Sequence, residues 1–147
     1  MFRITQGVVF MIEILDHTAD IGIRVRTKSL EELFKEAALG LVKIMFSFKR
    51  DLFPVEERVT ITIEAEDVEE LLVTWLNEIL YLFESRELAF KDINFMELKL
   101  HYLKAELDCF KVKNDEVSCY IKAATYHGLS VKKDEAGFYE ATIIFDI

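Results

Sequence analysis

The chain has 147 residues and a formal net charge of −9, from 27 acidic and 18 basic side chains. Hydrophobic residues make up 52% of it, which excludes a disordered or fibrous protein and is enough for the core of one domain. The longest basic clusters are two pairs, Lys49-Arg50 and Lys132-Lys133. Because tight binding of nucleic acid usually needs a basic patch, direct RNA or DNA binding by the isolated chain is not expected.

The first elements in chain order are two strands and a helix. Residues 12–15 are apolar enough for a strand, and residues 21–26 alternate apolar and charged side chains with the period of a half-buried strand. Ser29 is the expected N-cap of a helix that runs to about Phe46, with Glu32 completing a capping box. The apolar side chains of this helix fall at helical spacing: Leu30, Leu33, Phe34, Ala37, Leu41, Ile44 and Met45.

A second strand and helix follow. Residues 58–65 alternate with period two, and Asp67 with Glu70 is expected to cap a helix. Aromatic residues at helical spacing are usually packing residues, so we interpret the stripe of this helix as core rather than as a ligand pocket. The stripe consists of Leu71, Leu72, Trp75, Leu76, Ile79, Leu80 and Phe83.

The rest of the chain is predicted to be mostly β. Strands are expected near 89–100, 103–112 and 117–125, followed by a hairpin from Leu129 to Phe145 with its turn at residues 134–137. Since strands and helices do not alternate regularly, the fold class is α+β, with two amphipathic helices packed on a mostly antiparallel β-sheet. Residues 1–147 are expected to form a single domain, in which residues 1–10 are a dispensable extension and Met11 is an alternative start.

Cys109 and Cys119 lie about equally far on either side of Asn114, so a hairpin turning there would bring them together. Two reduced thiols in a strand pair are favoured over a disulfide. The apolar stretch at residues 8–12 is too short to span a membrane, so no membrane association is expected and the cytoplasm is the predicted compartment.

Local signatures of several enzyme classes are absent from the sequence. It contains no glycine-rich phosphate loop, no Cys/His spacing for structural zinc and no nucleophile elbow. Metal-free acid–base chemistry stays open, because paired carboxylates can converge from distant positions.

Two segments place acidic residues where a solvated surface does not require them. Residues 16–20 carry two aspartates between predicted strands, and Asp146 interrupts an apolar run that ends at Ile147. If the segments lie side by side, Asp20, Asp146 and the terminal oxygens of Ile147 form a set of oxygen ligands suited to a hard divalent cation. The alternative is that Asp20 caps backbone N–H groups in a turn and that the chain end is solvated.

Three further residues are candidates for a partner contact. His17, beside two aspartates, could bind a metal or a partner, although a histidine in a tight turn more often bonds the backbone. Lys122 and His127 lie within residues 121–128, a predicted strand that runs into a bend at Gly128, and they could serve a partner surface or an anion. A lysine at a strand end is usually only solvated.

These segments resemble the archease family. Residues 17–23, His-Thr-Ala-Asp-Ile-Gly-Ile, are similar to its HTADIGI signature, residues 122–127 to its KAxTYH motif, and residues 145–147 to its ending of an aspartate followed by one aliphatic residue. Residues 64–67, Glu-Ala-Glu-Asp, resemble its entry to the second helix. The likeness extends from about Ile12 to the end, and its three main motifs occur in the family's order.

The resemblance implies a protein cofactor rather than an enzyme. Archeases assist the RtcB-type RNA ligase, which uses GTP and manganese to join RNA ends in tRNA splicing and RNA repair, by promoting guanylylation of its histidine and multiple turnover. The resemblance implies a divalent cation, Ca²⁺ first and Mg²⁺ or Mn²⁺ as alternatives, held by Asp20, Asp146 and Ile147. It implies RNA contact only through the ligase, with Lys122 as a candidate contact to the ligase or its nucleotide.

Two other functions compete with this interpretation. A metal-dependent enzyme acting on its own would need a substrate pocket beside the acidic residues. A chaperone-like interaction module would depend on exposed apolar surface and would tolerate the loss of Asp20.

Overall fold

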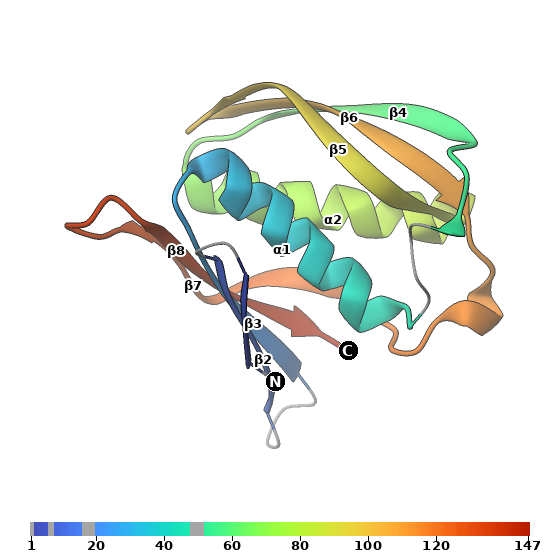
Figure 1. Cartoon of the computed structure of the whole chain (residues 1–147), viewed down its shortest axis with the longest axis horizontal. Coiled ribbons are helices and arrows are strands. Elements are labelled where there is room, and N and C mark those ends of the chain that lie inside the picture. Colours follow the sequence, from blue (N-terminus) through green and yellow to red (C-terminus); the bar gives the residue numbers. More distant parts are fainter. Residues whose placement is uncertain (1, 6–7, 16–19, 48–51) are drawn as a thin grey trace.

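The computed structural model describes residues 2–5, 8–15, 20–47 and 52–147. Two helices lie between two antiparallel sheets, so the described chain forms three layers (Figure 1). The expectation of two helices packed on mostly antiparallel sheet is confirmed. The strands, however, are divided between two sheets, one on each side of the helices.

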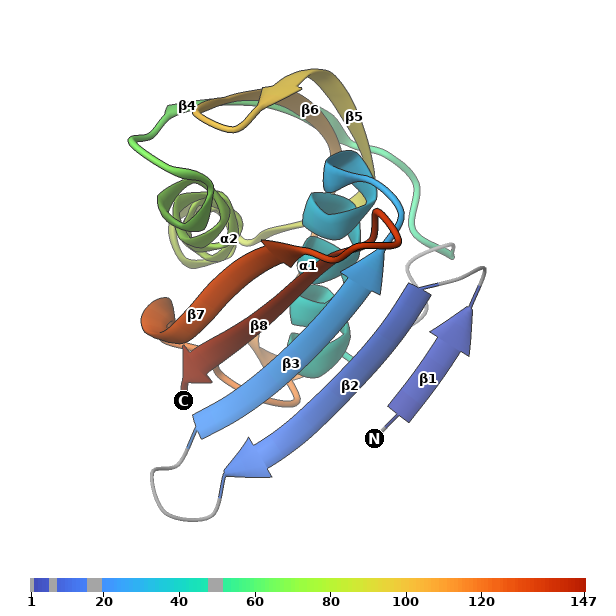
Figure 2. The same cartoon turned by 90° about the vertical axis from the view of Figure 1, so that its left-hand side faces the viewer.

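One layer is a five-stranded sheet in the order β1-β2-β3-β8-β7 (Figure 2). Its strands are β1 (Phe2–Thr5), β2 (Val8–Leu15), β3 (Asp20–Thr27), β7 (Ala123–Lys133) and β8 (Tyr139–Asp146). In β3 the buried side chains of Ile21, Ile23 and Val25 alternate with Arg24 and Arg26. Successive side chains of a strand point to opposite faces, so the sheet has an inner face that packs on the helices and an outer face.

The opposite layer is a three-stranded sheet in the order β4-β6-β5. Its strands are β4 (Glu57–Glu64), β5 (Leu88–Lys99) and β6 (Tyr102–Lys111). Ile61 and Ile63 of β4 are buried, whereas the alternating Thr60 and Thr62 are exposed, as the sequence predicted. This sheet covers the sides of both helices that the five-stranded sheet leaves open (Figure 1).

The helices are α1 (Leu30–Met45) and α2 (Val68–Arg86), and both begin at the predicted caps. Ser29 Oγ accepts a hydrogen bond from the Glu32 N–H at 3.1 Å, and Asp67 Oδ1 accepts one from the Glu70 N–H at 2.8 Å. In each case the glutamate carboxylate reaches the N–H of the residue before the cap rather than that of the cap itself. The two helix starts are therefore fixed by local chemistry alone.

Both predicted apolar stripes lie in the core, which extends through all three layers. Trp75 of α2 is fully buried, and its indole N–H donates a hydrogen bond to the Phe34 carbonyl of α1 at 3.1 Å. The same indole packs on Phe95 of β5, with ring centroids 5.5 Å apart. The interpretation of these aromatic residues as packing residues is supported.

The strand predicted over 117–125 begins only at Ala123, so the prediction is wrong for residues 117–122. The chain after β6 makes a 3-10 turn, η2 (Asn114–Glu116), and Val117 then forms an isolated bridge with Phe46. The Ser118 N–H donates to the Met45 carbonyl at 2.7 Å, so this segment bonds to the end of α1 instead of folding back on β6. It carries the chain from one sheet to the other.

The expected hairpin at Asn114 is therefore absent, and the two cysteines are not in a strand pair. Cys109 is buried in β6, whereas Cys119 is partly exposed in the crossing segment, and both are free thiols. The preference for reduced thiols over a disulfide agrees with the structure, but the strand pair in which the two thiols were expected is absent from the described residues.

The last hairpin forms, with a longer first strand than predicted. Strand β7 is continuous from Ala123 to Lys133, but Thr125 pairs with Ile144 and Ser130 with Thr142, so the four residues 126–129 lie opposite one residue of β8. Gly128 has φ +63° within this bulge, a conformation that favours glycine. The sequence placed a break between two strands where the structure has a bulge within one.

Candidate metal centre

The acidic residues Asp20 and Asp146, which we call the acid pair, lie directly opposite each other in the five-stranded sheet. Asp20 is the first residue of β3 and Asp146 the last of β8, and they are partners in the antiparallel register. Their neighbours Ile21 and Phe145 are buried on the inner face, so both carboxylates belong to the outer face. Side chains paired in this way have Cβ atoms about 4.5–5.5 Å apart.

The end of β8 is also attached to β7 on its other side. Ala123 pairs with Asp146, and the Lys122 N–H donates a hydrogen bond to the Asp146 carbonyl at 2.8 Å. Ile147, which follows, is half-buried and packs against the core. The main-chain position of Asp146 is therefore held by a strand on each side.

The charges at this position suit a cation. Two carboxylates opposite one another repel, and within the described residues neither forms an ion pair with a lysine, arginine or histidine. Carboxylate and main-chain oxygens are the ligands that Ca²⁺ and Mg²⁺ prefer, so the donor set fits a hard divalent cation.

A third donor is needed beyond the two aspartates. Among the described residues no three His, Cys, Asp or Glu side chains converge, so His127 does not complete a cluster with the acid pair. The next oxygen atoms along the chain are the main-chain oxygens of Ile147. These three residues are the set that the sequence proposed, and their role as metal ligands stays a prediction.

The structure also positions two of the three candidate contact residues. Lys122 is exposed and lies beside the acid pair, because its N–H is bonded to Asp146. His127 is exposed in the β7 bulge, where its N–H donates to Thr125 Oγ1 at 3.3 Å. His17 lies outside the described residues. Lys122, directly before β7, and His127, within β7, are thus available to a partner near Ala123, the residue that pairs with Asp146.

The far end of the same outer face carries basic side chains and a cavity of about 400 Å³. Arg24, four residues along β3 from Asp20, lies roughly 13 Å from it. Its guanidinium is 3.8 Å from the Glu140 carboxylate, and Arg26 donates to Asp134 at 2.7 Å. The hydrogen bond from Arg26 lowers the pKa of Asp134, with a further contribution from the Phe138 N–H. These acid–base pairs attach the tip of the β7–β8 hairpin to β3.

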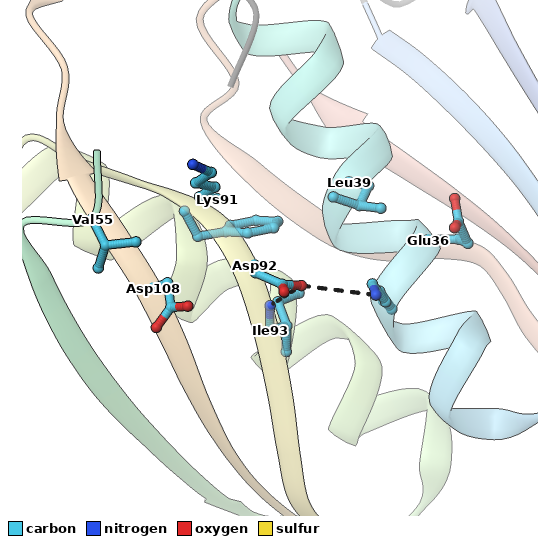
Figure 3. A pocket seen from close by; sticks show the side chains of 9 residues that line it. Glu36, Leu39, Val55, Lys91, Asp92, Ile93 and Asp108 are labelled. Carbon is cyan, nitrogen blue, oxygen red and sulfur yellow. Dashed lines mark hydrogen bonds and ion pairs between the residues drawn. The ribbon is translucent and has the colours of Figure 1, made fainter. Parts of the chain in front are cut away.

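A second cavity of about 460 Å³ lies between α1 and the edge strand β5 (Figure 3). Lys35 of α1 spans it to reach Asp92 of β5, with 3.8 Å between the ammonium nitrogen and the carboxylate oxygen. Among the residues that the sequence singled out for function, none of those that the structure describes lines either cavity. The substrate pocket beside the acid pair that an independent enzyme would need is therefore not provided by these two cavities.

A model of the Archease protein family (MTH1598/TM1083) matches residues 12–147. The chain belongs to the archease family. The archease of Methanosarcina barkeri is 34% identical over 141 residues, which cover 92% of this chain and 94% of that protein. The archease of Thermococcus kodakarensis is 36% identical over 138 residues, which cover 90% of this chain and 95% of that protein.

Solved structures share the archease fold with this chain. The solution structure of protein 1598 of Methanobacterium thermoautotrophicum aligns with a TM-score of 0.69 at 28% identity, covering 92% of this chain and 98% of that one. A crystal structure from Thermotoga maritima, described as an archease and possible chaperone, aligns with a TM-score of 0.60 at 25% identity and covers 93% and 98%. In the described part of this archease family member, neither helix has the length and apolar character needed to cross a membrane.

Sequence reasoning missed two residues that hold β7 in place. Thr125 Oγ1 donates to the Ile144 carbonyl at 2.9 Å and accepts from the His127 N–H, so it ties the bulge to β8. Asn77 of α2 bonds to both main-chain groups of Ala124. The signal for Asn77 was its place in the middle of a helix, where asparagine is unfavourable unless its side chain has a partner.

Proposed function

We propose that this chain is an archease-type protein cofactor that activates an RtcB-type RNA ligase in tRNA splicing and RNA repair. Membership of the archease family supports the general role. The single observation that carries the mechanism is the pairing of Asp20 with Asp146 on the outer face of the five-stranded sheet. Two opposed carboxylates at one end of a protein are suited to a metal-bearing nucleotide site on a partner.

In this proposal, Asp20, Asp146 and the main-chain oxygens of Ile147 hold a divalent cation, with Ca²⁺ as the first candidate. Such a cation would neutralise the two carboxylates and supply a Lewis-acidic contact to phosphate oxygens. The chain's own residues then act by position: β3 and β8 present the acid pair, and Lys122 beside it contacts the ligase or its nucleotide. Docking of the acid pair and Lys122 on the ligase favours the ligase conformation in which the ligase histidine accepts the guanylyl group.

The charge of the chain agrees with a role in which the ligase, and not this protein, holds the RNA. A net charge of −9 opposes binding of a polyanion, whereas it favours association with a basic partner surface. The basic side chains of the outer face are partly neutralised by Glu140 and Asp134. The cytoplasm is the compartment expected for this activity.

A chaperone-like role is the second candidate, since the Thermotoga maritima relative is described as a possible chaperone. Several large apolar or aromatic side chains are exposed, as such a role requires: Tyr81, Met96, Leu100, Tyr120 and Tyr126. The two functions differ in their dependence on Asp20, because apolar surface acts without the acid pair.

The test is ligation of a 3′-phosphate RNA at limiting ligase, with and without the protein. We expect added turnovers and more guanylylated ligase with the wild-type chain, and neither with Asp20→Ala or Asp146→Ala. Asp115→Ala is the matched control, because Asp115 is an exposed acid in η2, outside the sheet. Full activation by Asp20→Ala would contradict the proposal and favour the chaperone-like role, and RNA turnover without ligase would indicate an enzyme.

A further inference from the structure

Strand β7 is an edge strand of the five-stranded sheet, and its start is paired from two sides. On one side are the bonds to β8, from the Lys122 N–H to the Asp146 carbonyl and from Thr125 Oγ1 to the Ile144 carbonyl. On the other side, no strand is present among those described, and α2 takes that place. The main-chain groups of Ala124 that face α2 would lack partners if α2 presented only apolar side chains.

Asn77 supplies both partners. Its side-chain oxygen accepts from the Ala124 N–H at 2.8 Å, and its side-chain NH₂ donates to the Ala124 carbonyl at 3.2 Å. A carboxamide carries one acceptor and one donor group in the arrangement of a peptide, so it replaces one residue of a neighbouring strand. An aspartate in this position has no donor for the Ala124 carbonyl, and an alanine has neither group.

These bonds connect Asn77 with the acid pair through the start of β7. Ala124 is two residues from Lys122, whose N–H holds the Asp146 carbonyl, and Ala123 is the register partner of Asp146. If the start of β7 separates from the sheet, Asp146 loses its support on that side and keeps only its pairing with Asp20. An edge strand with unpaired main-chain groups opens more readily than one that is bonded on both sides.

We infer that Asn77 is the positioning residue that keeps the start of β7 docked and thereby holds Asp146 in register with Asp20. This inference rests on the proposed function for its effect on cation binding and ligase activation. The docking of β7 itself can be measured without either. The inference gives a residue of α2, which forms its side-chain bonds to Ala124, a role in positioning the acid pair.

The experiment compares Asn77→Ala with Glu69→Ala. Glu69 is the matched control, because it also joins α2 to β7, accepting from the Val131 N–H at 3.4 Å, but at the opposite end of the strand. Amide hydrogen exchange of the metal-free proteins is followed by NMR at Lys122, Ala124 and Val131. Calcium affinity is then measured by calorimetry. Ligase activation is measured by ligation of a 3′-phosphate RNA at limiting ligase.

We expect Asn77→Ala to speed exchange at Lys122 and Ala124 by roughly tenfold, and to weaken calcium binding by a similar factor. Glu69→Ala should affect Val131 and leave Lys122 and calcium affinity unchanged. If Asn77→Ala folds too poorly, Asn77→Asp is used, since it keeps the acceptor for the Ala124 N–H, with the same direction of change expected.

Two results would overturn the inference. One is unchanged exchange at Lys122 in the Asn77 variants. The other is an equal loss of calcium affinity in Asn77→Ala and Glu69→Ala, which would indicate only general destabilisation. If exchange changes as expected but even Asp20→Ala leaves calcium binding intact, the positioning of β7 stands and the proposed metal site fails.

Discussion

Asp20 of β3 and Asp146 of β8 are direct partners in an antiparallel pair, and both belong to the face of the sheet turned away from the helices. A sheet gains nothing from two like charges opposite each other, because such pairs are destabilising. The arrangement is understandable if a bound cation offsets that cost. It follows that the stability of the protein should depend on divalent cations through these two residues.

Replacing one member of the pair tests this dependence. In metal-free buffer, Asp146→Asn should raise the free energy of unfolding by up to about 1 kcal/mol, because it removes the repulsion from Asp20. Calcium should raise the Tm of the wild-type protein and of Asp115→Asn, but not that of Asp146→Asn. Thermal unfolding followed by circular dichroism, with and without calcium, measures both effects. An equal calcium-dependent rise in all three proteins would place the cation elsewhere.

The ion pair between Arg26 and Asp134 predicts a pH dependence. Its hydrogen bond lowers the pKa of Asp134 below the usual 3.8, so the folded protein favours the carboxylate. The stabilisation is therefore fully present above the usual pKa and is lost as the pH falls through the lowered one. Urea unfolding of wild type and Asp134→Asn should differ at neutral pH and converge in strong acid. Glu135→Gln, in the same turn, is the control and should follow the wild type at every pH.

The two cysteines should react at very different rates. Burial is the main cause that raises the pKa of Cys109 from 9.0 to about 12, and the nearby Glu57 carboxylate adds to it. At a given pH, the thiolate fraction of Cys109 is therefore about 10³-fold lower than that of an ordinary cysteine. Cys119 is only partly buried, although burial raises its pKa too. Brief alkylation of the native protein, read by mass spectrometry, should modify Cys119 and spare Cys109, and both should react in urea. A native protein with no reactive thiol would contradict the free thiols described above.

Trp75 joins the two helices, so its replacement should lower stability. Trp75→Phe removes the bond to the Phe34 carbonyl and leaves a void, which should reduce the free energy of unfolding by about 1–3 kcal/mol. Tyr81→Phe is the control on the same helix, since Tyr81 is exposed and its change should stay within about 0.5 kcal/mol. Urea unfolding followed by circular dichroism gives both values. A smaller effect for Trp75 than for Tyr81 would be inconsistent with the packing described.

Features decided by neighbouring residues were predictable from the sequence. Ser29 and Asp67 cap helices through atoms three residues away, and the apolar stripes that follow give the buried faces. The β7 bulge was not predictable, because Gly128 marks a turn equally well in a hairpin or in a bulge. Only the pairing of β7 with β8 on both sides of the bulge distinguishes these two structures.

The residues of the candidate site were predictable from the sequence, but their arrangement in space was not. Asp20 and Asp146 stood out because each interrupts or borders an apolar strand, and the family motifs contain both. Their register as direct partners depends on β3 and β8 becoming neighbours, which no local pattern specifies. Asn77 was missed for a similar reason, since its partner Ala124 is distant in the chain and a lone polar residue in a helix does not reveal what it binds.

The order of the strands has a consequence for the synthesis of the protein. Asp20 emerges from the ribosome well before Asp146, and the pairing of β3 with β8 closes a loop that includes both helices and the whole three-stranded sheet. Contacts of such high contact order form late, because the entropy of closing the loop must be overcome first. A nascent or truncated chain that lacks β8 therefore has no acid pair, whatever else it has folded. Asp20 and Asp146 face each other only in molecules in which β8 has docked on β3, so a chain in which that strand is missing or undocked lacks the proposed cation site.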